Sequence, residues 1–250
     1  MKYFIVIKQN SERVERKNFQ ILGGKPLWKH LISELKNEDV YIDTDSPDII
    51  EACKSIDYIT CYQRDQKHID LENDSSFGLS PGLLMVDRFL DTYIKDENEI
   101  FVITHVTSPF LRKETIQQAA LKLAEGYDSV QACTFHQEYA YYRGKEINWN
   151  PTVLQKTQNL EPIVFINGAF FILAKKTFKT NNSRIGKKPY LYKLPVGESI
   201  EIDTCDDLEL ARRWVKCEPI IKNMEKKELL RSLVLNGLGP QNGVGGWIRE

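Results

Sequence analysis

A group of cationic and hydrogen-bonding side chains follows the first apolar segment of the chain. Residues 3–7 read YFIVI, and residues 8–18 read KQNSERVERKN. The polar groups available in this loop are Lys8, Asn10, Ser11, Arg13, Arg16, Lys17 and Asn18. Cations combined with backbone N–H groups form anion sites, and a polyphosphate is the ligand that suits them. The spacing fits neither a Walker loop nor a GxGxxG fingerprint. A solvated loop of alternating charges is the competing interpretation.

Two carboxylates near residue 200 provide a second set of chemical groups. Glu201 and Asp203 alternate in SIEID (199–203), which we expect to be a strand, so both side chains project from one face. Two oxygen ligands on one face suit Mg²⁺, which keeps several waters and bridges phosphates. Asp206 and Asp207 follow Thr204 and are typical of the first turn of a helix instead. We therefore predict a Mg²⁺ site at Asp203, with Glu201.

A third set of polar groups lies in HVTSP (105–109) and in the Asn167–Gly168 pair. Thr107 and Ser108 can cap the following helix or hydrogen-bond a ligand. Gly168 interrupts an apolar strand, which indicates close approach of a ligand to the backbone. Asn167 either bonds hydroxyl groups of that ligand or belongs to a β-bulge.

The elements that must position these groups alternate between two periodicities. Apolar runs bounded by turn residues predict buried strands at 3–7, 40–45, 58–62, 99–106, 129–135, 163–173 and 199–203. Helical periodicity predicts helices at about 26–36, 46–55, 81–95, 113–125 and 206–216, with Pro26 at a first helical position. This alternation predicts an α/β fold with a mostly parallel sheet. Ligands of such sheets bind beyond the carboxyl ends of the strands, where loop 8–18 begins.

Two segments depart from this alternation. Residues 136–161 are aromatic, polar and rich in turns, and we expect an inserted hairpin that acts as a lid or as a dimer arm. Its aromatic residues suit a dimer surface better than a base-stacking platform: Tyr139, Tyr141, Tyr142 and Trp149. We expect one domain over residues 1–218, followed by a helix and a flexible glycine-rich tail over 219–250.

Composition limits the classes of partner and compartment. Thirty-four basic residues against thirty-five acidic ones give a net charge of −1, which argues against nucleic-acid and membrane partners. No apolar run approaches the roughly 20 residues that span a bilayer, and the N-terminus does not read as a signal peptide. Five cysteines without CxxC spacing indicate ordinary thiols in the cytoplasm and no zinc site.

Five motifs in order along the chain carry a resemblance to a known family. They are SxRxxxKN followed by GGKPL (11–27), IDTDSPDI (42–49), THVTSPFLRKETI (104–116), NGAFFI (167–172) and EIDTCDDLELA (201–211). This set resembles the cytidylyltransferases that activate acidic sugars, which include CMP-sialic acid synthetases and their pseudaminate, legionaminate and 3-deoxy-manno-octulosonate relatives. The resemblance implies the Rossmann-like fold of nucleotide-diphospho-sugar transferases, with helices on both faces of the sheet. It also implies CTP and a 2-keto sugar acid as substrates, Mg²⁺ as cofactor, and a homodimer.

The resemblance assigns roles to individual residues. Lys8, Arg13 and Lys17 would act as catalytic cations that neutralise the triphosphate. The remaining nucleotide-binding residues would be Asn10, Ser11, Asn18 and Arg64. The sugar would be bound by His105, Thr107, Ser108, Gln158, Asn167 and Gly168. Asp203 and Glu201 would hold the metal. For the sugar carboxylate one cation is expected among Arg143, Lys145 and Lys156, with no basis for choosing between them.

The chain departs from the family pattern at several of these positions. Lys8, Gln9 and Asn10 stand where the family has Arg, Gly and Gly, Glu201 replaces an Asp, and His105 replaces a Gln. Lysine keeps the charge of arginine but lacks its bidentate fork. Two alternatives to the cytidylyltransferase activity therefore stay open. One is a nucleotidyltransferase for another base or a neutral sugar phosphate, and the other is a non-catalytic sugar-nucleotide binder.

Overall fold

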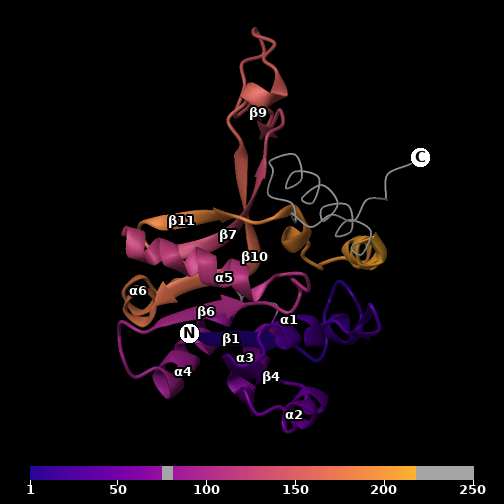
Figure 1. The fold of residues 1–250 in the computed structure, drawn as a ribbon, viewed down its shortest axis with the longest axis vertical. Helices are drawn as coiled ribbons and strands as arrows, with labels where there is room; N and C mark the ends of the chain where they lie inside the picture. The colour runs from indigo at the N-terminus through magenta and orange to yellow at the C-terminus, as the bar shows by residue number, and fades with distance from the viewer. Residues whose placement is uncertain (75–80, 218–250) are drawn as a thin grey trace, which may run out of the picture.

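The computed structural model describes residues 1–74 and 81–217, and a single mixed sheet organises them (Figure 1). Within these residues the central sheet has the strand order β11-β7-β10-β6-β1-β4-β5. Its strands are β1 Lys2–Ile7, β4 Asp39–Thr44, β5 Ile59–Gln63, β6 Ile100–Thr104, β7 Ser129–His136, β10 Ile163–Ala174 and β11 Pro189–Lys193. β10 runs antiparallel to both of its neighbours, and the other pairings are parallel. The mostly parallel sheet is thus confirmed.

Helices cover both faces of this sheet, as expected. They are α1 Trp28–Glu34, α2 Pro47–Cys53, α3 Gln66–Asn73, α4 Gly82–Tyr93, α5 Lys113–Ala120 and α6 Lys175–Asn181, and residues 205–217 are also helical. Short 3₁₀ turns occupy η1 Lys17–Phe19, η2 Leu121–Glu125, η3 Thr157–Asn159 and η4 Val196–Ser199. Small antiparallel pairs join β2 Ile21–Leu22 to β3 Lys25–Pro26, and β8 Tyr141–Tyr142 to β9 Lys145–Glu146.

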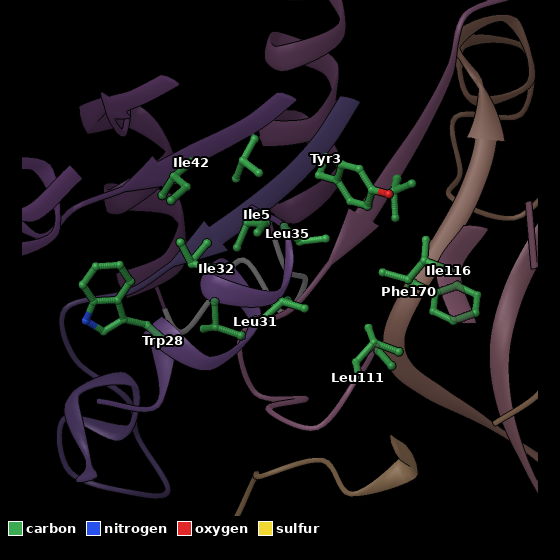
Figure 2. Packing of buried hydrophobic residues seen from close by; sticks show 14 of the residues in the cluster. Tyr3, Ile5, Trp28, Leu31, Ile32, Leu35, Ile42, Leu111, Ile116 and Phe170 are labelled. Carbon is green, nitrogen blue, oxygen red and sulfur yellow. The ribbon is translucent and has the colours of Figure 1, made fainter. Parts of the chain in front are cut away.

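Alternation along each strand divides the core between the two faces. Ile5 of β1 packs with Leu31 and Ile32 of α1 (Figure 2). Phe4, one residue earlier, packs on the opposite face against Phe89 of α4, with ring centroids 4.8 Å apart. Each such side chain, taken out of water, contributes roughly 1.5–3 kcal/mol to folding. Burial on both faces holds the strand ends of the sheet at fixed positions.

Several sequence expectations about local structure are wrong. No strand forms at 199–203, where η4 leads into an extended segment that lies outside the sheet. Pro26 lies in β3 rather than at the start of a helix, because α1 begins at Trp28. The pattern also missed α3, α6 and β11, which are short or polar and therefore carry little apolar periodicity.

The inserted hairpin over 136–161 is confirmed. It extends the antiparallel pair of β7 and β10 away from the body of the molecule and carries β8 and β9 (Figure 1). Arg143 and Gly144 form the turn between β8 and β9, both with positive φ. Its role as a lid or dimer arm stays a prediction. The helix and tail expected over 219–250 lie outside the described residues.

None of the helices in the described residues is both long and apolar enough to span a bilayer.

Candidate functional site

Loop 8–18 leaves the carboxyl end of β1 and is fixed at both of its ends. Asn18 is buried, and its Nδ2 donates to the Lys8 carbonyl oxygen at 2.9 Å. Val14, at the middle of the loop, is buried in a small cluster with Leu22 and Ile202. One polar and one apolar anchor therefore hold the loop in place.

The loop takes its shape without the two glycines of the family pattern. The Gln9 backbone N–H donates to Asp45 Oδ1 at 2.7 Å, and its side chain accepts from Ser46 Oγ at the start of α2. Neither Gln9 nor Asn10 has a positive φ, so the conformation does not require glycine at these positions. Asn10 is exposed and Ser11 is half-buried. Within the described residues neither makes a hydrogen bond, which leaves both open to a ligand.

Two of the three predicted catalytic cations converge on one predicted metal ligand. Lys17 Nζ and Arg13 Nη2 each lie 2.9 Å from Asp203 Oδ1. Asp203 lies 186 positions after Lys17 in the sequence. We call Arg13, Lys17 and Asp203 the open cluster. Asp203 is 39% exposed, so the cluster faces solvent. The carboxylate holds both cations in place.

Lys8 points in another direction and belongs to a second group of charges. Lys8 Nζ pairs with Glu72 Oε1 of α3 at 2.7 Å, and Glu72 Oε2 accepts from Arg64 Nη1 at 2.7 Å. Arg64 Nε donates to Asp43 Oδ1 at 2.7 Å, and the Arg64 and Asp43 side chains are fully buried. Arg88 Nη1 lies 3.7 Å from Asp43 Oδ2. We call these five residues the buried cluster.

The buried cluster changes what can be expected of Arg64. Besides its two carboxylate partners, Arg64 Nη2 donates to the Ile7 carbonyl oxygen at 3.3 Å, where loop 8–18 begins. A nucleotide phosphate would reach this guanidinium only by displacing Asp43 or Glu72. Direct nucleotide binding by Arg64 stays a prediction, and its contacts make it a residue that positions the start of the loop.

Glu201 lies beside Asp203 although the expected strand is absent. The Ile202 N–H donates to the Thr107 carbonyl oxygen at 2.8 Å, and the Ile202 side chain is buried, which turns its two neighbours the other way. Glu201 Oε2 accepts from the Gly168 N–H at 3.0 Å. Burial raises the pKa of Glu201 and the Asp203 charge raises it further, while Gly168, Lys17 and Arg184 oppose the shift.

Gly168 has a steric reason to be glycine. A Cβ at this position would lie 2.4 Å from Glu201 Oε1, so any side chain would displace the carboxylate. The strand also shifts register between Ile166 and Phe171, which is the bulge considered for Asn167. Asn167 Nδ2 donates to the Ser199 carbonyl oxygen and its Oδ1 accepts from the Ala169 N–H, both at 2.9 Å. Asn167 therefore secures the bulge and the segment before Glu201.

His105 lies over the same bulge. Its Nδ1 is 2.6 Å from the Gly168 carbonyl oxygen, which can only accept, so Nδ1 carries the proton and Nε2 is the acceptor. Burial is the main cause that lowers the pKa of His105, so the ring is neutral at neutral pH. The Arg184 and Lys17 charges lower this pKa too, while the Asp203 charge raises it.

The other predicted sugar residues are divided between this site and the inserted hairpin over 136–161, which we call the arm. Thr107 is tied to Ile202 through its backbone, and Ser108 is buried, with an Oγ that has no partner among the described residues. Gln158 lies on the arm in η3, away from the site, and its carbonyl oxygen accepts from Gln137 Nε2. Arg184, whose charge lowers the pKa of both His105 and Glu201, is not among the residues predicted from the sequence. A lone arginine in a turn between two elements carries no recognisable sequence signal.

Asp207 has the structural role expected from its position. Its Oδ2 accepts from the Asp203 N–H at 3.1 Å, the Thr204 N–H at 2.8 Å and Thr204 Oγ1 at 2.8 Å. Burial alone would raise the pKa of Asp207, but these hydrogen bonds lower it overall. The cap fixes the backbone immediately after the metal-binding candidate Asp203.

Comparison with known proteins identifies the family. A family model described as "Cytidylyltransferase" matches residues 5–212, which include loop 8–18, the His105 strand end, the bulge and both carboxylates. The chain belongs to this cytidylyltransferase family. The predicted family is thereby confirmed.

Individual cytidylyltransferases resemble the chain at low identity. An N-acylneuraminate cytidylyltransferase of Streptococcus agalactiae is 25% identical over 81% of this chain, which spans about half the length of that relative. A CMP-N,N'-diacetyllegionaminic acid synthase of Legionella pneumophila is 26% identical over 85% of this chain and 94% of its own.

A solved structure shares the fold. The structure of CMP:2-keto-3-deoxy-manno-octonic acid synthetase complexed with CTP superposes with a TM-score of 0.57 at 13% identity, over 86% of this chain and 98% of its own. This likeness confirms the nucleotidyltransferase type of fold.

The carboxylates present suit a magnesium ion of the kind expected for a cytidylyltransferase. Asp203 Oδ2 and Glu201 Oε1 make no hydrogen bond within the described residues. The described residues contain no group of three or more His, Cys, Asp or Glu side chains that would form a closed metal site. Mg²⁺ is commonly bound by one or two carboxylates together with substrate phosphates. The donor set thus fits Mg²⁺ bound jointly with a nucleotide.

Proposed function

We propose that this cytidylyltransferase family member transfers the cytidylyl group of CTP to a 2-keto sugar acid of the nonulosonate type. The observation that carries the proposal is the pairing of Lys17 and Arg13 with Asp203, beside Glu201 and His105. Cations that would suit a triphosphate, oxygen atoms that would suit a metal and an acceptor that would suit a sugar hydroxyl lie together at the carboxyl edge of a mostly parallel sheet, where ligands of such sheets bind.

The reaction is an in-line displacement at the α-phosphorus. The anomeric hydroxyl oxygen of the sugar acid forms a new bond to the α-phosphorus of CTP, and the bond from that phosphorus to the oxygen leading to the β-phosphate breaks. Pyrophosphate leaves with the bonding electrons, and the hydroxyl proton is released to solvent. Such a reaction requires mainly positioning and charge neutralisation.

Residues of this chain would provide both requirements. Lys17 and Arg13 would exchange Asp203 for the phosphates of CTP, because their present contact is open to solvent. Asn10 and Ser11 would donate hydrogen bonds to the same phosphates. His105 Nε2 would accept a hydrogen bond from a sugar hydroxyl, since Nδ1 is committed to the Gly168 carbonyl oxygen.

Asp203 and Glu201 would hold Mg²⁺, as their free oxygen atoms allow. When bound, the ion would supply positive charge beside the α-phosphate and the leaving pyrophosphate.

We further propose that the arm joins two copies of this chain. It presents large apolar side chains to solvent, with Leu154 93% exposed and Tyr141 and Tyr142 more than half exposed, and Phe165 and Ile166 of the adjoining strand β10 are also more than half exposed. Such a patch on a projecting hairpin favours a protein partner. A homodimer predicts a mass of two chains in size-exclusion chromatography with light scattering, and a monomer at micromolar concentration would contradict it.

Two measurements test the proposed activity. The first is pyrophosphate release with CTP and Mg²⁺, using N-acetylneuraminate, legionaminate, pseudaminate and 3-deoxy-manno-octulosonate as acceptors. The expected result is release with at least one nine-carbon acid. Absence of release with all four acids would contradict the proposal.

The second measurement compares nucleotides through thermal unfolding with Mg²⁺. CTP at 100 times its dissociation constant should stabilise the protein by about 2.7 kcal/mol, which raises the midpoint by roughly 5–10 °C. UTP, GTP and ATP should have little effect. Equal protection by another nucleotide would favour a different nucleotidyltransferase, and protection without pyrophosphate release would favour a non-catalytic binder.

A further inference from the structure

Arg184 lies in the turn between α6 and β11, and this turn is held rigidly. The Asp128 carboxylate accepts from the backbone N–H groups of Lys187 and Lys188 at 2.7–3.0 Å. The Gly186 N–H donates to Ser129 Oγ at 2.8 Å, and a Cβ on Gly186 would lie 2.1 Å from Asp128 Oδ1. The turn therefore presents Arg184 from a fixed backbone rather than from a loose loop.

The guanidinium of Arg184 is itself positioned by stacking. Its Cζ lies 4.1 Å from the centroid of the Phe171 ring, and Phe171 is fully buried in the sheet. A guanidinium stacked on an aromatic face keeps its N–H donors at the edge, in a fork that matches a carboxylate. Arg184 as a residue is exposed, so a ligand can approach that edge.

Arg184 lacks a partner of opposite charge within residues 1–74 and 81–217. It forms no ion pair or hydrogen bond there, and its guanidinium lies over the Phe171 ring. Other arginines do have carboxylate partners at 2.7–3.4 Å: Arg13, Arg16, Arg64, Arg88 and Arg213. A rigid, stacked guanidinium without a counterion is a ready site for an anion.

Arg184 lies beside the candidate active site, because the Phe171 ring beneath it is three residues beyond Gly168 in β10, where β10 pairs with the end of β6 that leads to His105. Although the residue as a whole is exposed, partial desolvation of its guanidinium lowers the pKa of Arg184, and the Glu201 carboxylate partly restores it. Arg184 in turn lowers the pKa of His105 and that of Glu201. The guanidinium thus shares its environment with a sugar-binding candidate and a metal-binding candidate, although neither is close enough to form an ion pair with it.

The chemistry of the proposed substrate requires a cation here. In a 2-keto sugar acid the carboxylate and the anomeric hydroxyl are attached to the same carbon. When that hydroxyl attacks the α-phosphate beside Asp203 and Glu201, the carboxylate must lie within a few ångströms of these two residues. The cations expected from the sequence do not meet this condition within the chain, because Arg143, Lys145 and Lys156 lie on the projecting arm (Figure 1).

We propose that Arg184 binds the carboxylate of the sugar acid and thereby determines the specificity of the enzyme for acidic sugars. This inference rests on the proposed cytidylyltransferase activity. It adds a specificity residue that none of the five sequence motifs contains.

The test compares four proteins with the acid that the wild type converts best and with the carboxamide of that acid. The proteins are the wild type, Arg184→Ala, Arg184→Lys and the matched arm variant Arg143→Ala. Losing a charge-assisted hydrogen bond should raise the KM of Arg184→Ala for the acid roughly 10- to 100-fold. Its KM for CTP and its thermal midpoint should stay within about twofold and a few degrees of the wild type. The KM of Arg184→Lys for the acid should fall between those of the wild type and Arg184→Ala. The KM of Arg143→Ala should match that of the wild type.

The ratio of acid to carboxamide turnover separates binding from a structural role. The wild type should prefer the acid, and Arg184→Ala should lose most of this preference, which misfolding would not produce. An unchanged ratio in both Arg184 variants, with the wild type active, would overturn the inference and leave the proposed function standing. A loss confined to Arg143→Ala would assign the carboxylate to the arm and would also overturn it. A wild type that converts none of the four acids would overturn the proposed function, and this inference with it.

Discussion

The open cluster and the buried cluster contain the same kinds of side chain and differ in their access to water. In the open cluster Asp203 is 39% exposed and Arg13 is 63% exposed. In the buried cluster the side chains of Arg64 and Asp43 have no exposed surface. Ion pairs in contact with water are worth little and exchange readily, whereas breaking a buried pair leaves an uncompensated charge.

Because of this difference, the two clusters can have different roles at the same edge of the sheet. The open cluster can release Asp203 for a metal and its cations for phosphates at little cost. The buried cluster joins the ends of β1, β4 and β5 through Arg64, which reaches the Ile7 carbonyl oxygen and the Asp43 carboxylate. The loop thus carries the cations that can exchange partners, Lys17 and Arg13. The buried Arg64–Asp43 pair, which does not exchange, holds the start of this loop in place.

The largest effect is expected from Asp203→Ala in the open cluster. The variant loses a metal-binding oxygen and the anchor for Lys17 and Arg13, so its kcat for pyrophosphate release should fall at least about 10³-fold. Its free energy of unfolding should stay within about 1 kcal/mol of the wild type, since the site is open. The exposed neighbour Asp206→Ala is the matched control and should stay near full activity. An Asp203→Ala protein with more than a tenth of the wild-type rate would show that the metal assignment is wrong.

The next effect concerns stability and is expected in the buried cluster. Arg64→Met leaves Asp43 buried beside a neutral side chain, so the free energy of unfolding should fall by about 3–4 kcal/mol in urea titrations. The matched change Arg13→Met should cost less than about 1 kcal/mol, because Arg13 is largely exposed. Similar losses in the two variants would remove the distinction between the clusters.

A smaller effect separates the two lysines at the ends of the loop. Lys17→Ala should lower kcat/KM for CTP about 100-fold, because Lys17 lies against Asp203 where the phosphates are expected. Lys8→Ala should lower it only about 10-fold, since Lys8 is paired with Glu72 away from Asp203. The measurement is initial-rate kinetics with the sugar acid saturating. If Lys8→Ala has the greater effect, CTP must draw Lys8 away from Glu72 on binding.

The smallest effect is a pH dependence of stability near the buried cluster. Burial is the main cause that lowers the pKa of His68 from its usual 6.5, so below about pH 6.5 the unfolded chain takes up a proton that the folded chain does not. Stability should therefore fall as the pH drops from 7.5 to 5.5, by no more than the limit of about 1.4 kcal/mol for a single histidine. His68→Gln should lose this share of the pH dependence in urea titrations. His136→Gln, on the arm, should keep the wild-type slope, and an unchanged slope in His68→Gln would rule out His68 as the source.

The α/β class, the loop after the first strand and the family could all be predicted from the sequence. Strand and helix periodicities are local properties, and the motifs that carry the resemblance are short and in order. The same information indicated the cationic loop, Asp203, His105 and the Asn167–Gly168 pair, because each lies in a motif at or near a predicted strand end.

Which charges meet could be seen only in the folded structure. It paired Lys17 and Arg13 with Asp203, turned Lys8 toward Glu72 and Arg64 toward Asp43 and Glu72, and placed Arg184 over Phe171 beside the bulge. It also replaced the strand expected at 199–203 by an extended segment, where the buried Ile202 still keeps Glu201 and Asp203 on the other side. Electrostatic contacts join residues far apart in the chain, so they depend on packing and leave no periodic signal in the sequence.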